Sequence, residues 1–487
     1  MYSTLIDRLP RIEGYLRVVL SQTETKNEIL LKSGLSTHLD LNLQERFPLE
    51  ALHLTQSLSE HSCVAHAIAS VSALEDYLKI YPTETGLRIR QVLLDLSTIR
   101  SHIYHFYWEI LPGYLNFEHY EQSSKNEPMF YFGQLRREKE KGDLDLETGK
   151  KLLSSISKAA KVIDLLQKSM TLFGGKYPVI MNQIPGGVSN FSLSRSLNMT
   201  VIRNLELCKS FIEETWPLDL KEFVQNIPNS TLVLETNPNL ISFGSLPIEQ
   251  NKGKTSNYSE GVLLKGKLEP VNELKITETL TDTYYLPTDK SDNNPQKLYA
   301  LNKPGARTWI KGARYNEQTM ITGALSRMMI THLVGGNLEI SDIISQMIDD
   351  LELTFESPNC TASRLLSEVL EGRIYLKNIF KNLFEISGDS DTNRKTRFNF
   401  SPEGVGIGKI ESPSGSLLHQ VYISNSRIKK YVIISPMNWN FSPGDEEGKK
   451  GVVETELNQL TKARDLTPIM IARHLHSYNA QILDGTR

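Results

Sequence analysis

The sequence predicts a mainly helical α+β protein that forms one large domain over residues 1–487. Apolar residues recur at helical spacing through most of the chain, whereas strand-like alternation is confined to a few short stretches. No stretch has the composition of an interdomain linker. We therefore expect a long helical bundle with short strands at its periphery, in a chain long enough to bury a large core.

The expected elements follow the chain from its N-terminus. Alternation of apolar and polar residues predicts strands at Tyr15–Leu20 and Glu28–Leu31. Apolar residues at helical intervals then predict a series of long helices, at about 48–81, 87–120, 146–172, 191–226, 316–350 and 360–386. A pair of strands is expected around the turn Ser424–Ser426, where apolar residues alternate on both sides (Val421, Ile423, Val432 and Ile434).

Residues 226–300 differ from the helical body in composition. They contain Asn-Pro-Asn, Lys-Gly-Lys-Thr-Ser-Asn and Ser-Asp-Asn-Asn-Pro, all rich in residues that form turns. We expect short strands and loops here, as a variable excursion from the helices. Residues 388–396 are expected to form a short polar loop.

Charge and cysteine usage exclude several classes of function. A net charge of -3 gives no electrostatic basis for binding nucleic acid. Cys63, Cys208 and Cys360 are far apart in the sequence, which argues against a disulfide scaffold and favours a reducing compartment. The N-terminal residues do not have the pattern of a signal peptide, and no apolar run is long enough to cross a membrane. We expect a cytoplasmic protein that is not inserted in a membrane.

The C-terminal segment His476–Asp484 is the most informative motif of the chain. Its sequence, His-Ser-Tyr-Asn-Ala-Gln-Ile-Leu-Asp, resembles the H-S-F-D-P-C-x-x-C motif of the large subunit of nickel–iron hydrogenases. Gln481 and Asp484 stand at the positions of the two cysteines, which in that family are metal ligands.

Two segments near the N-terminus resemble the same family. Arg11–Val18 is similar to the family's R-I-E-G-H-L-R segment, and Ser57–Asp76 is similar to R-x-C-G-x-C-x-x-x-H-x-x-A-S. Counted back from His66, the two cysteines of the second motif fall on Ser59 and Ser62. All four positions that the resemblance assigns to cysteine ligands therefore carry other residues.

The resemblance runs in order from Arg11 to the C-terminus and is weakest over 226–300. The remaining similar segments are Ser101–Tyr107, Gly174–Pro178, Pro185–Val188, Thr308–Tyr315, Gly323–Arg327, Glu411–Gly415 and Ser435–Asp445. Ser414 stands where the family has an arginine close to the diatomic ligands of the iron. The two histidines of Ser101–Tyr107 are most simply core residues with satisfied ring nitrogens. The resemblance implies the fold of a hydrogenase large subunit.

A conventional nickel–iron centre is not expected at these positions. Nickel and iron of this kind require soft thiolates, and the alcohol of a serine is far less acidic than a thiol. Cys63 and His66 lie three residues apart on an expected helix, so they are alternative ligand candidates, although such a pair also fits an ordinary core.

Glu13 is the candidate proton relay, because burial can raise the pKa of a carboxyl group. The alternative is a carboxylate that pairs with Arg11 or Arg17. Without a redox metal beside it, the pairing is the simpler interpretation of Glu13.

The resemblance allows three functions. The first is a non-catalytic homologue that assists hydrogenase assembly, meeting maturation chaperones or transiently holding an iron atom with cyanide and carbonyl ligands, Fe(CN)2CO. The second is a subunit of an electron-transfer complex with a small-subunit-like iron–sulfur protein, since the related large subunit of respiratory complex I also lacks these cysteines and uses the cavity for quinone. The third is a divergent oxidoreductase of hydrogenase type with another metal, or none, in the old cavity.

Overall fold

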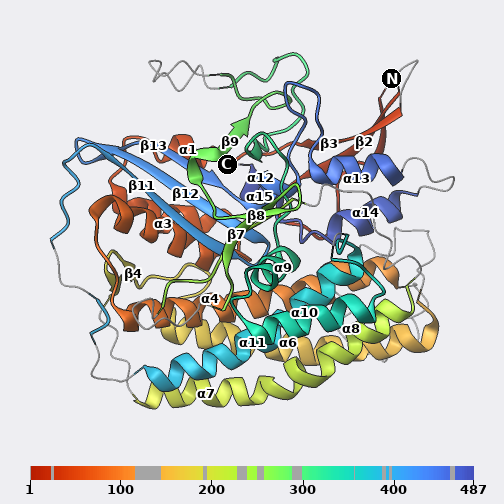
Figure 1. The fold of residues 1–487 in the computed structure, drawn as a ribbon, viewed down its shortest axis with the longest axis horizontal. Coiled ribbons are helices and arrows are strands. Elements are labelled where there is room, and N and C mark those ends of the chain that lie inside the picture. The colour runs from red at the N-terminus through yellow and green to blue at the C-terminus, as the bar shows by residue number, and fades with distance from the viewer. Residues whose placement is uncertain are drawn as a thin grey trace.

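The structure is a computed structural model that describes residues 2–22, 27–115, 144–189, 195–227, 239–248, 257–287, 299–355, 357–386, 391–393, 397–460 and 467–486. A layer of long helices lies on one side of the molecule, and a three-stranded sheet with one buried helix lies on the other (Figure 1). A second three-stranded sheet, formed by the N-terminal residues, lies beside the C-terminal helices (Figure 1).

The longer helices bury their apolar faces against one another in one extended core. They are α3 (Cys63–Leu78), α4 (Glu84–Tyr104), α6 (Leu146–Gly174), α7 (Arg195–Ser210), α8 (Trp216–Gln225), α9 (Ala324–Val334), α10 (Leu338–Asp350) and α11 (Thr361–Glu385). Polar side chains fix several starts: Thr83 caps α4, and Asp145 caps α6 by accepting from the backbone N–H groups of Glu147 and Thr148.

The strands form small antiparallel sheets. Their bounds are β1 (Tyr2–Ile6), β2 (Leu16–Gln22), β3 (Asn27–Ser33), β4 (Gln183–Ile184), β5 (Gly187–Val188), β6 (Leu240–Phe243), β7 (Glu260–Leu264), β8 (Lys267–Glu269), β9 (Ile276–Thr279), β10 (Gly312–Tyr315), β11 (Gly404–Ser412), β12 (Gly415–Ser424) and β13 (Arg427–Ile434). Asn425 and Ser426 have φ values of 52° and 59°, as a two-residue hairpin turn between β12 and β13 requires.

Helix α3 packs directly on the edge strand β11. A Cβ atom on Gly406 would lie 2.0 Å from the carbonyl oxygen of Ala73, and one on Gly408 would lie 2.1 Å from that of Ala69. Glycine at these two positions therefore lets the helix backbone approach the strand backbone. This close contact fixes where the first turn of α3 lies.

The two ends of the chain meet beside the start of α3. The C-terminal part contains α12 (Pro436–Asn440), α13 (Val452–Leu460), α14 (Pro468–His476) and the short α15 (Ile482–Gly485). The backbone N–H of Leu483 donates to the carbonyl of Glu13 at 3.3 Å, and that of Thr37 donates to the carbonyl of Thr486 at 2.9 Å. Residues from both ends are thus held around one buried point.

Most of the elements predicted from the sequence are present. The strands at 15–20 and 28–31, the hairpin around Ser424–Ser426 and the helices over 146–172 and 360–386 are confirmed. The described part of 226–300 contains the short strands β6 to β9, as expected. Residues 116–120 and 191–194 of the expected helices, and most of the loop expected at 388–396, lie outside the described residues.

Two helix predictions had wrong boundaries. The helix expected over 316–350 begins at Ala324, because Gly323 has a φ of 139°, and it is divided after α9, where Gly335 has a φ of 71°. The helix expected over 48–81 is interrupted by turns that precede Cys63. In both cases the local backbone conformation, and not the apolar spacing, decides where the helix begins or ends.

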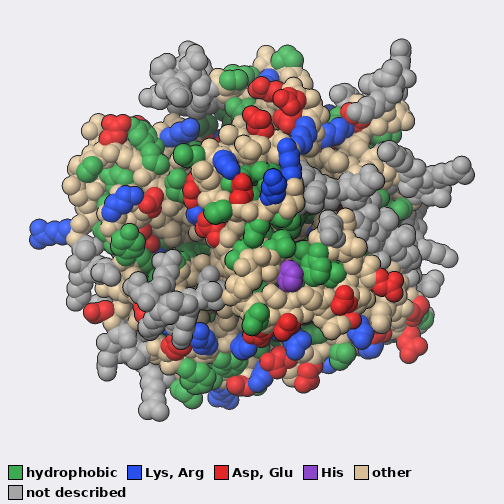
Figure 2. Space-filling view, viewed as in Figure 1, with side chains coloured by type: hydrophobic (Ala, Val, Ile, Leu, Met, Phe, Trp, Pro, Cys, Tyr) green, Lys and Arg blue, Asp and Glu red, His purple; other side chains and the backbone are tan. Residues whose placement is uncertain are grey.

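Charged residues of both signs are interspersed on the face shown in Figure 2. This distribution agrees with the small net charge of the chain. No helix among the described residues is long and apolar enough to span a bilayer.

Candidate functional site

The four residues at the expected ligand positions lie around the start of α3. Ser59 and Ser62 precede α3, whereas Gln481 and Asp484 lie on the turn that forms α15. All four side chains are buried, with no more than 3% exposed. Ser62 Oγ donates a hydrogen bond of 2.7 Å to Asp484 Oδ2. A direct hydrogen bond therefore joins two of the four positions.

Asp484 also begins a chain of buried hydrogen bonds. Its Oδ1 lies 3.4 Å from His66 Nε2, and His66 Nδ1 lies 2.9 Å from His419 Nε2. His419 Nδ1 lies 2.9 Å from the hydroxyl of Tyr431, which donates to Ser70 at 2.9 Å. Because the phenol proton goes to Ser70, its oxygen accepts from His419, and His419 Nε2 accepts from His66 Nδ1. This chain of contacts links the C-terminal turn to β12 and β13 through His66 of α3.

Glu13 is a buried carboxyl group beside this cluster. Its Oε1 accepts the backbone N–H of Glu60 at 3.0 Å. Burial raises the pKa of Glu13 to about 7, against the opposing effect of a hydrogen bond from Ser59. Arg17, one of the two partners considered for Glu13, instead pairs with Asp7 at 2.6 Å. A carboxyl group with a pKa near neutrality is suited to exchange protons, which keeps Glu13 as a candidate relay.

A second carboxyl group of this kind, Glu109, was not singled out from the sequence. It lies in a π-helical turn over His105–Ile110, four residues after His105. Burial raises the pKa of Glu109 to about 7. Gln481 Nε2 lies 3.4 Å from Glu109 Oε1 and donates to Asn479 Oδ1 at 2.9 Å. The spacing from His105 places Glu109 on the same helix face, but spacing alone does not show that its carboxyl group is buried.

The two histidines of Ser101–Tyr107 are buried, as expected, and both contact carboxylates. His102 Nε2 lies 3.0 Å from Glu371, and His105 Nδ1 lies 2.7 Å from Glu368. Burial alone would lower the pKa of His105, but Glu368 beside it raises that pKa to about 9. These histidines therefore belong to a buried charged network and are more than apolar packing.

Two basic residues of the Thr308–Tyr315 segment pair with carboxylates. Lys311 Nζ lies 2.9 Å from Asp40, and Arg314 Nε lies 3.6 Å from Asp445. These pairs tie the segment to both the N-terminal and the C-terminal parts of the chain.

Cys63 and His66 lie on the first turn of α3, as their spacing predicts. Both side chains are fully buried, and burial raises the pKa of Cys63 to about 12. A thiol with so high a pKa stays protonated, whereas metal binding requires the thiolate. Within the described ranges, no three residues among His, Cys, Asp and Glu gather closely enough to hold a metal ion.

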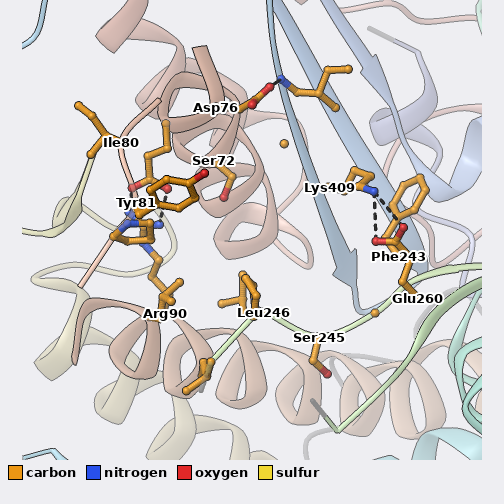
Figure 3. Close-up of a pocket in the computed structure, with 18 of the residues that line it drawn as sticks. Ser72, Asp76, Ile80, Tyr81, Arg90, Phe243, Ser245, Leu246, Glu260 and Lys409 are labelled. Atoms are coloured by element: carbon orange, nitrogen blue, oxygen red, sulfur yellow. Dashed lines mark hydrogen bonds and ion pairs between the residues drawn. The ribbon is translucent and has the colours of Figure 1, made fainter. Parts of the chain in front are cut away.

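A separate cavity of about 600 Å³ lies between the end of α3, the start of α4 and the connection from β6 to β7 (Figure 3). Its charged side chains pair with one another: Arg90 lies 2.8 Å from Glu75, and Lys409 lies 3.1 Å from Glu260. The residues around Asp484 do not line it. The cluster around Asp484 is the better candidate site, because burial raises the pKa values of the neighbouring carboxyl groups of Glu13 and Glu109 to about 7.

The fold and the position of this cluster define a hydrogenase large-subunit class of protein. A model of the nickel-dependent hydrogenase family matches residues 38–116 and 137–482, so the chain belongs to that family. The large subunit of the periplasmic [NiFeSe] hydrogenase of Desulfomicrobium baculatum is 24% identical, over 97% of this chain and 92% of its own length. The uptake hydrogenase large subunit of Bradyrhizobium diazoefficiens is 23% identical, over 98% of this chain and 93% of its own length.

Solved structures confirm the fold. The reduced Ni-Fe-Se hydrogenase of Desulfovibrio vulgaris Hildenborough matches with a TM-score of 0.82 and 23% identity, covering all of both chains. The H2-activated [NiFeSe] hydrogenase of Dm. baculatum matches with a TM-score of 0.81 and 20% identity, again over all of both chains. The expected α+β fold of a hydrogenase large subunit is therefore correct.

Proposed function

We propose that this chain is a non-catalytic member of the hydrogenase large-subunit family that assists the assembly of a hydrogenase. The observation that carries the proposal is the 2.7 Å hydrogen bond between Ser62 and Asp484, at two positions where the family has cysteine ligands. A side-chain pair that satisfies itself in this way has no need of a metal between its members.

The residues present do not fit a nickel–iron centre. The four positions offer two hydroxyl groups, one amide and one carboxylate, where soft thiolates are required. Asp484 is also engaged by His66 at 3.4 Å on its second oxygen. A metal ion bound here would have to break both contacts and leave Ser62 and His66 without their partner. Catalysis through a conventional centre is therefore not part of the proposed function.

An assembly role is supported by what the chain retains. The similarity to hydrogenase large subunits extends over 97–98% of this chain. The differences singled out above fall on the four ligand positions and on Ser414. A protein with the fold of a large subunit but without the cysteine ligands is suited to bind the chaperones that insert the metal centre. We propose maturation chaperones as partners, a cytoplasmic location and, at most, transient contact with an Fe(CN)2CO unit.

A second candidate is a large subunit of an electron-transfer complex with a rewired or metal-free site. The raised pKa values of Glu13 and Glu109, both about 7, favour this alternative. They leave two groups that can exchange protons beside the four expected ligand positions. Its expected partner is an iron–sulfur protein like a hydrogenase small subunit.

Purification of the tagged full chain from its own host distinguishes these functions. The assembly role predicts that hydrogenase maturation chaperones co-purify, and that hydrogenase in cells lacking this chain contains less metal. Stable one-to-one recovery with an iron–sulfur subunit, together with normal metal content of the hydrogenase in the deletion strain, would refute the assembly role and support the alternative.

A further inference from the structure

A small cavity of about 30 Å³ lies between the start of α9 and the segment Ser477–Asn479. Arg364, Ser414 and Glu368 also line it. This volume accommodates one water molecule or one small ion. Ser62 and Asp484 do not line this cavity, which adjoins the site described above through Asn479, the hydrogen-bond partner of Gln481.

Three hydrogen-bond donors that line this cavity have no partner among the residues that the structure describes. They are the hydroxyl of Ser414, Nδ2 of Asn479 and Nε of Arg364, and all three atoms are buried. Ser414 and Asn479 are only 4% and 3% exposed, respectively. Buried polar atoms are almost always hydrogen-bonded in proteins, so three free donors around one cavity indicate a missing acceptor.

Neighbouring contacts fix these donors in place. Gln481 Nε2 donates to Asn479 Oδ1 at 2.9 Å, which leaves the NH2 group of Asn479 for another acceptor. The other two nitrogens of Arg364 donate to Asn359 and Ser477, each at 2.7 Å. The guanidinium group also stacks over the ring of Tyr478, 4.1 Å from its centroid. Because Arg364 is held on three sides, its Nε–H cannot readily turn to another partner.

The N-terminus of α9 adds further positive potential. Gly323 to Ser326 line the cavity, and Gly323 is the N-cap of this 11-residue helix without a side-chain cap. The first N–H groups of a helix have no intrahelical acceptor, and the helix dipole favours an anion at this end.

Among the described residues that line the cavity, Glu368 is the one with an acidic side chain. It already pairs with His105 at 2.7 Å and lies 3.7 Å from His102. The two histidines therefore compensate the negative charge of Glu368. The positive charge of the Arg364 guanidinium group is left to attract an anion.

We propose that this cavity binds a small monovalent anion, of the size of chloride or formate, through Arg364, Ser414, Asn479 and the first N–H groups of α9. The resemblance implies an arginine at position 414, and the smaller serine leaves room for the anion. Such a site would stabilise the contact between α9 and the C-terminal segment. The proposal does not depend on the assembly role.

Bromide is the probe, because its anomalous scattering separates it from water in a crystal of the full chain. We expect an anomalous peak in this cavity and a rise in Tm with bromide when gluconate keeps the ionic strength constant. Asn479→Asp retains the bond from Gln481 but places a carboxylate against the anion, and we expect it to weaken bromide binding at least tenfold. Ser414→Ala removes one donor with little change of shape, and we expect a several-fold weakening even if Asn479→Asp folds poorly.

Asn337→Asp is the matched control, since Asn337 caps α10 through its side-chain oxygen and an aspartate can do the same. It makes the same change of charge away from the cavity, and bromide binding should be unchanged. A cavity that holds water at high bromide concentration would overturn the proposal. Bromide that binds equally well to wild type, Asn479→Asp and Ser414→Ala would be an adventitious ion and would overturn it as well.

Discussion

Ser62 and Asp484 are 422 positions apart in the sequence, yet the serine hydroxyl donates a 2.7 Å hydrogen bond to the carboxylate in the buried interior. This contact joins the start of α3 to the C-terminal turn α15. In a large subunit with a metal, coordination would connect these two segments. Here a hydrogen bond, continued through His66 and His419, makes the same connection.

The first prediction concerns the strength of this contact. Replacing a buried, paired charge by a neutral group typically costs about 3–5 kcal/mol, so Asp484→Ala should lower the free energy of unfolding by that amount. Ser62→Ala should cost about 2 kcal/mol, since it removes a hydrogen bond to a charged group. The double variant should cost clearly less than the sum in urea unfolding. Additive losses would show that the two side chains are not coupled.

Asp164 provides the control for this cycle. It pairs with Lys168 at 2.6 Å, but both side chains are more than half exposed. Asp164→Ala should change the free energy of unfolding by less than about 1 kcal/mol, because exposed ion pairs contribute little.

The second prediction is a pH dependence due to Glu13. Its pKa is about 7 in the folded chain, whereas the ordinary pKa of a glutamate side chain is 4.5, so the folded state holds a proton that the unfolded state releases. This contribution to stability is complete below pH 4.5 and is lost as the pH rises through 7. Glu13→Gln lacks this titration. Between pH 4 and pH 8 its free energy of unfolding should therefore rise by about 3 kcal/mol relative to that of the wild type. Parallel stability curves for the two proteins would contradict the raised pKa.

The third prediction concerns the thiols. All three cysteines are free and buried, and burial raises the pKa values of Cys63 and Cys208 to about 12. At pH 8 a disulfide reagent should react with none of them in the folded protein and with three per chain in denaturant.

Cobalt(II) then tests Cys63 as a metal ligand directly. We expect no thiolate-to-cobalt absorption in the folded protein, and Cys63→Ser and Cys208→Ser should behave alike. An absorption band that is lost in Cys63→Ser and kept in Cys208→Ser would instead establish a metal site at Cys63 and, by its position, His66.

The fourth prediction concerns the support of the site. A methyl group on Gly408 would lie 2.1 Å from the carbonyl oxygen of Ala69, so Gly408→Ala must push α3 away from β11. We expect a loss of at least about 3 kcal/mol in the free energy of unfolding, because overpacking against backbone has no easy relief. Gly404→Ala is the control, since its nearest contact is the ring edge of Tyr77 at 3.1 Å and the loss should be smaller. Equal losses would mean that the contact of β11 with α3 is not a close constraint.

The fold and the four ligand positions were predicted from local motifs that resemble those of the hydrogenase large-subunit family. The fold is confirmed, whereas the assignment of the four ligand positions stays a prediction. Helix α11, Thr361–Glu385, was predicted at 360–386 from its apolar period. Ser59 and Ser62 were located by counting back from His66, and the structure places Ser62 against Asp484. That the chain forms a single domain stays a prediction.

Sequence reasoning missed what depends on tertiary contact. Strand β11 contains Gly404, Gly406 and Gly408, which disfavour a strand by themselves and are explained only by the approach of α3. His419 comes from β12 and meets His66 at 2.9 Å, a contact that no local pattern contains. Glu109 has a raised pKa because it is buried, and burial of one carboxyl group cannot be read from helical spacing.

The most direct test is elemental analysis of the purified chain, with infrared spectroscopy in the cyanide and carbonyl region. The comparison is a variant with cysteine at positions 59, 62, 481 and 484, co-expressed with the maturation proteins. Its metal content shows whether this fold takes up nickel and iron when the four thiols are present. We expect nickel far below one atom per chain in the wild type, and we expect cyanide and carbonyl bands to accompany any iron. Nickel and iron together, each near one atom per chain, would contradict this expectation.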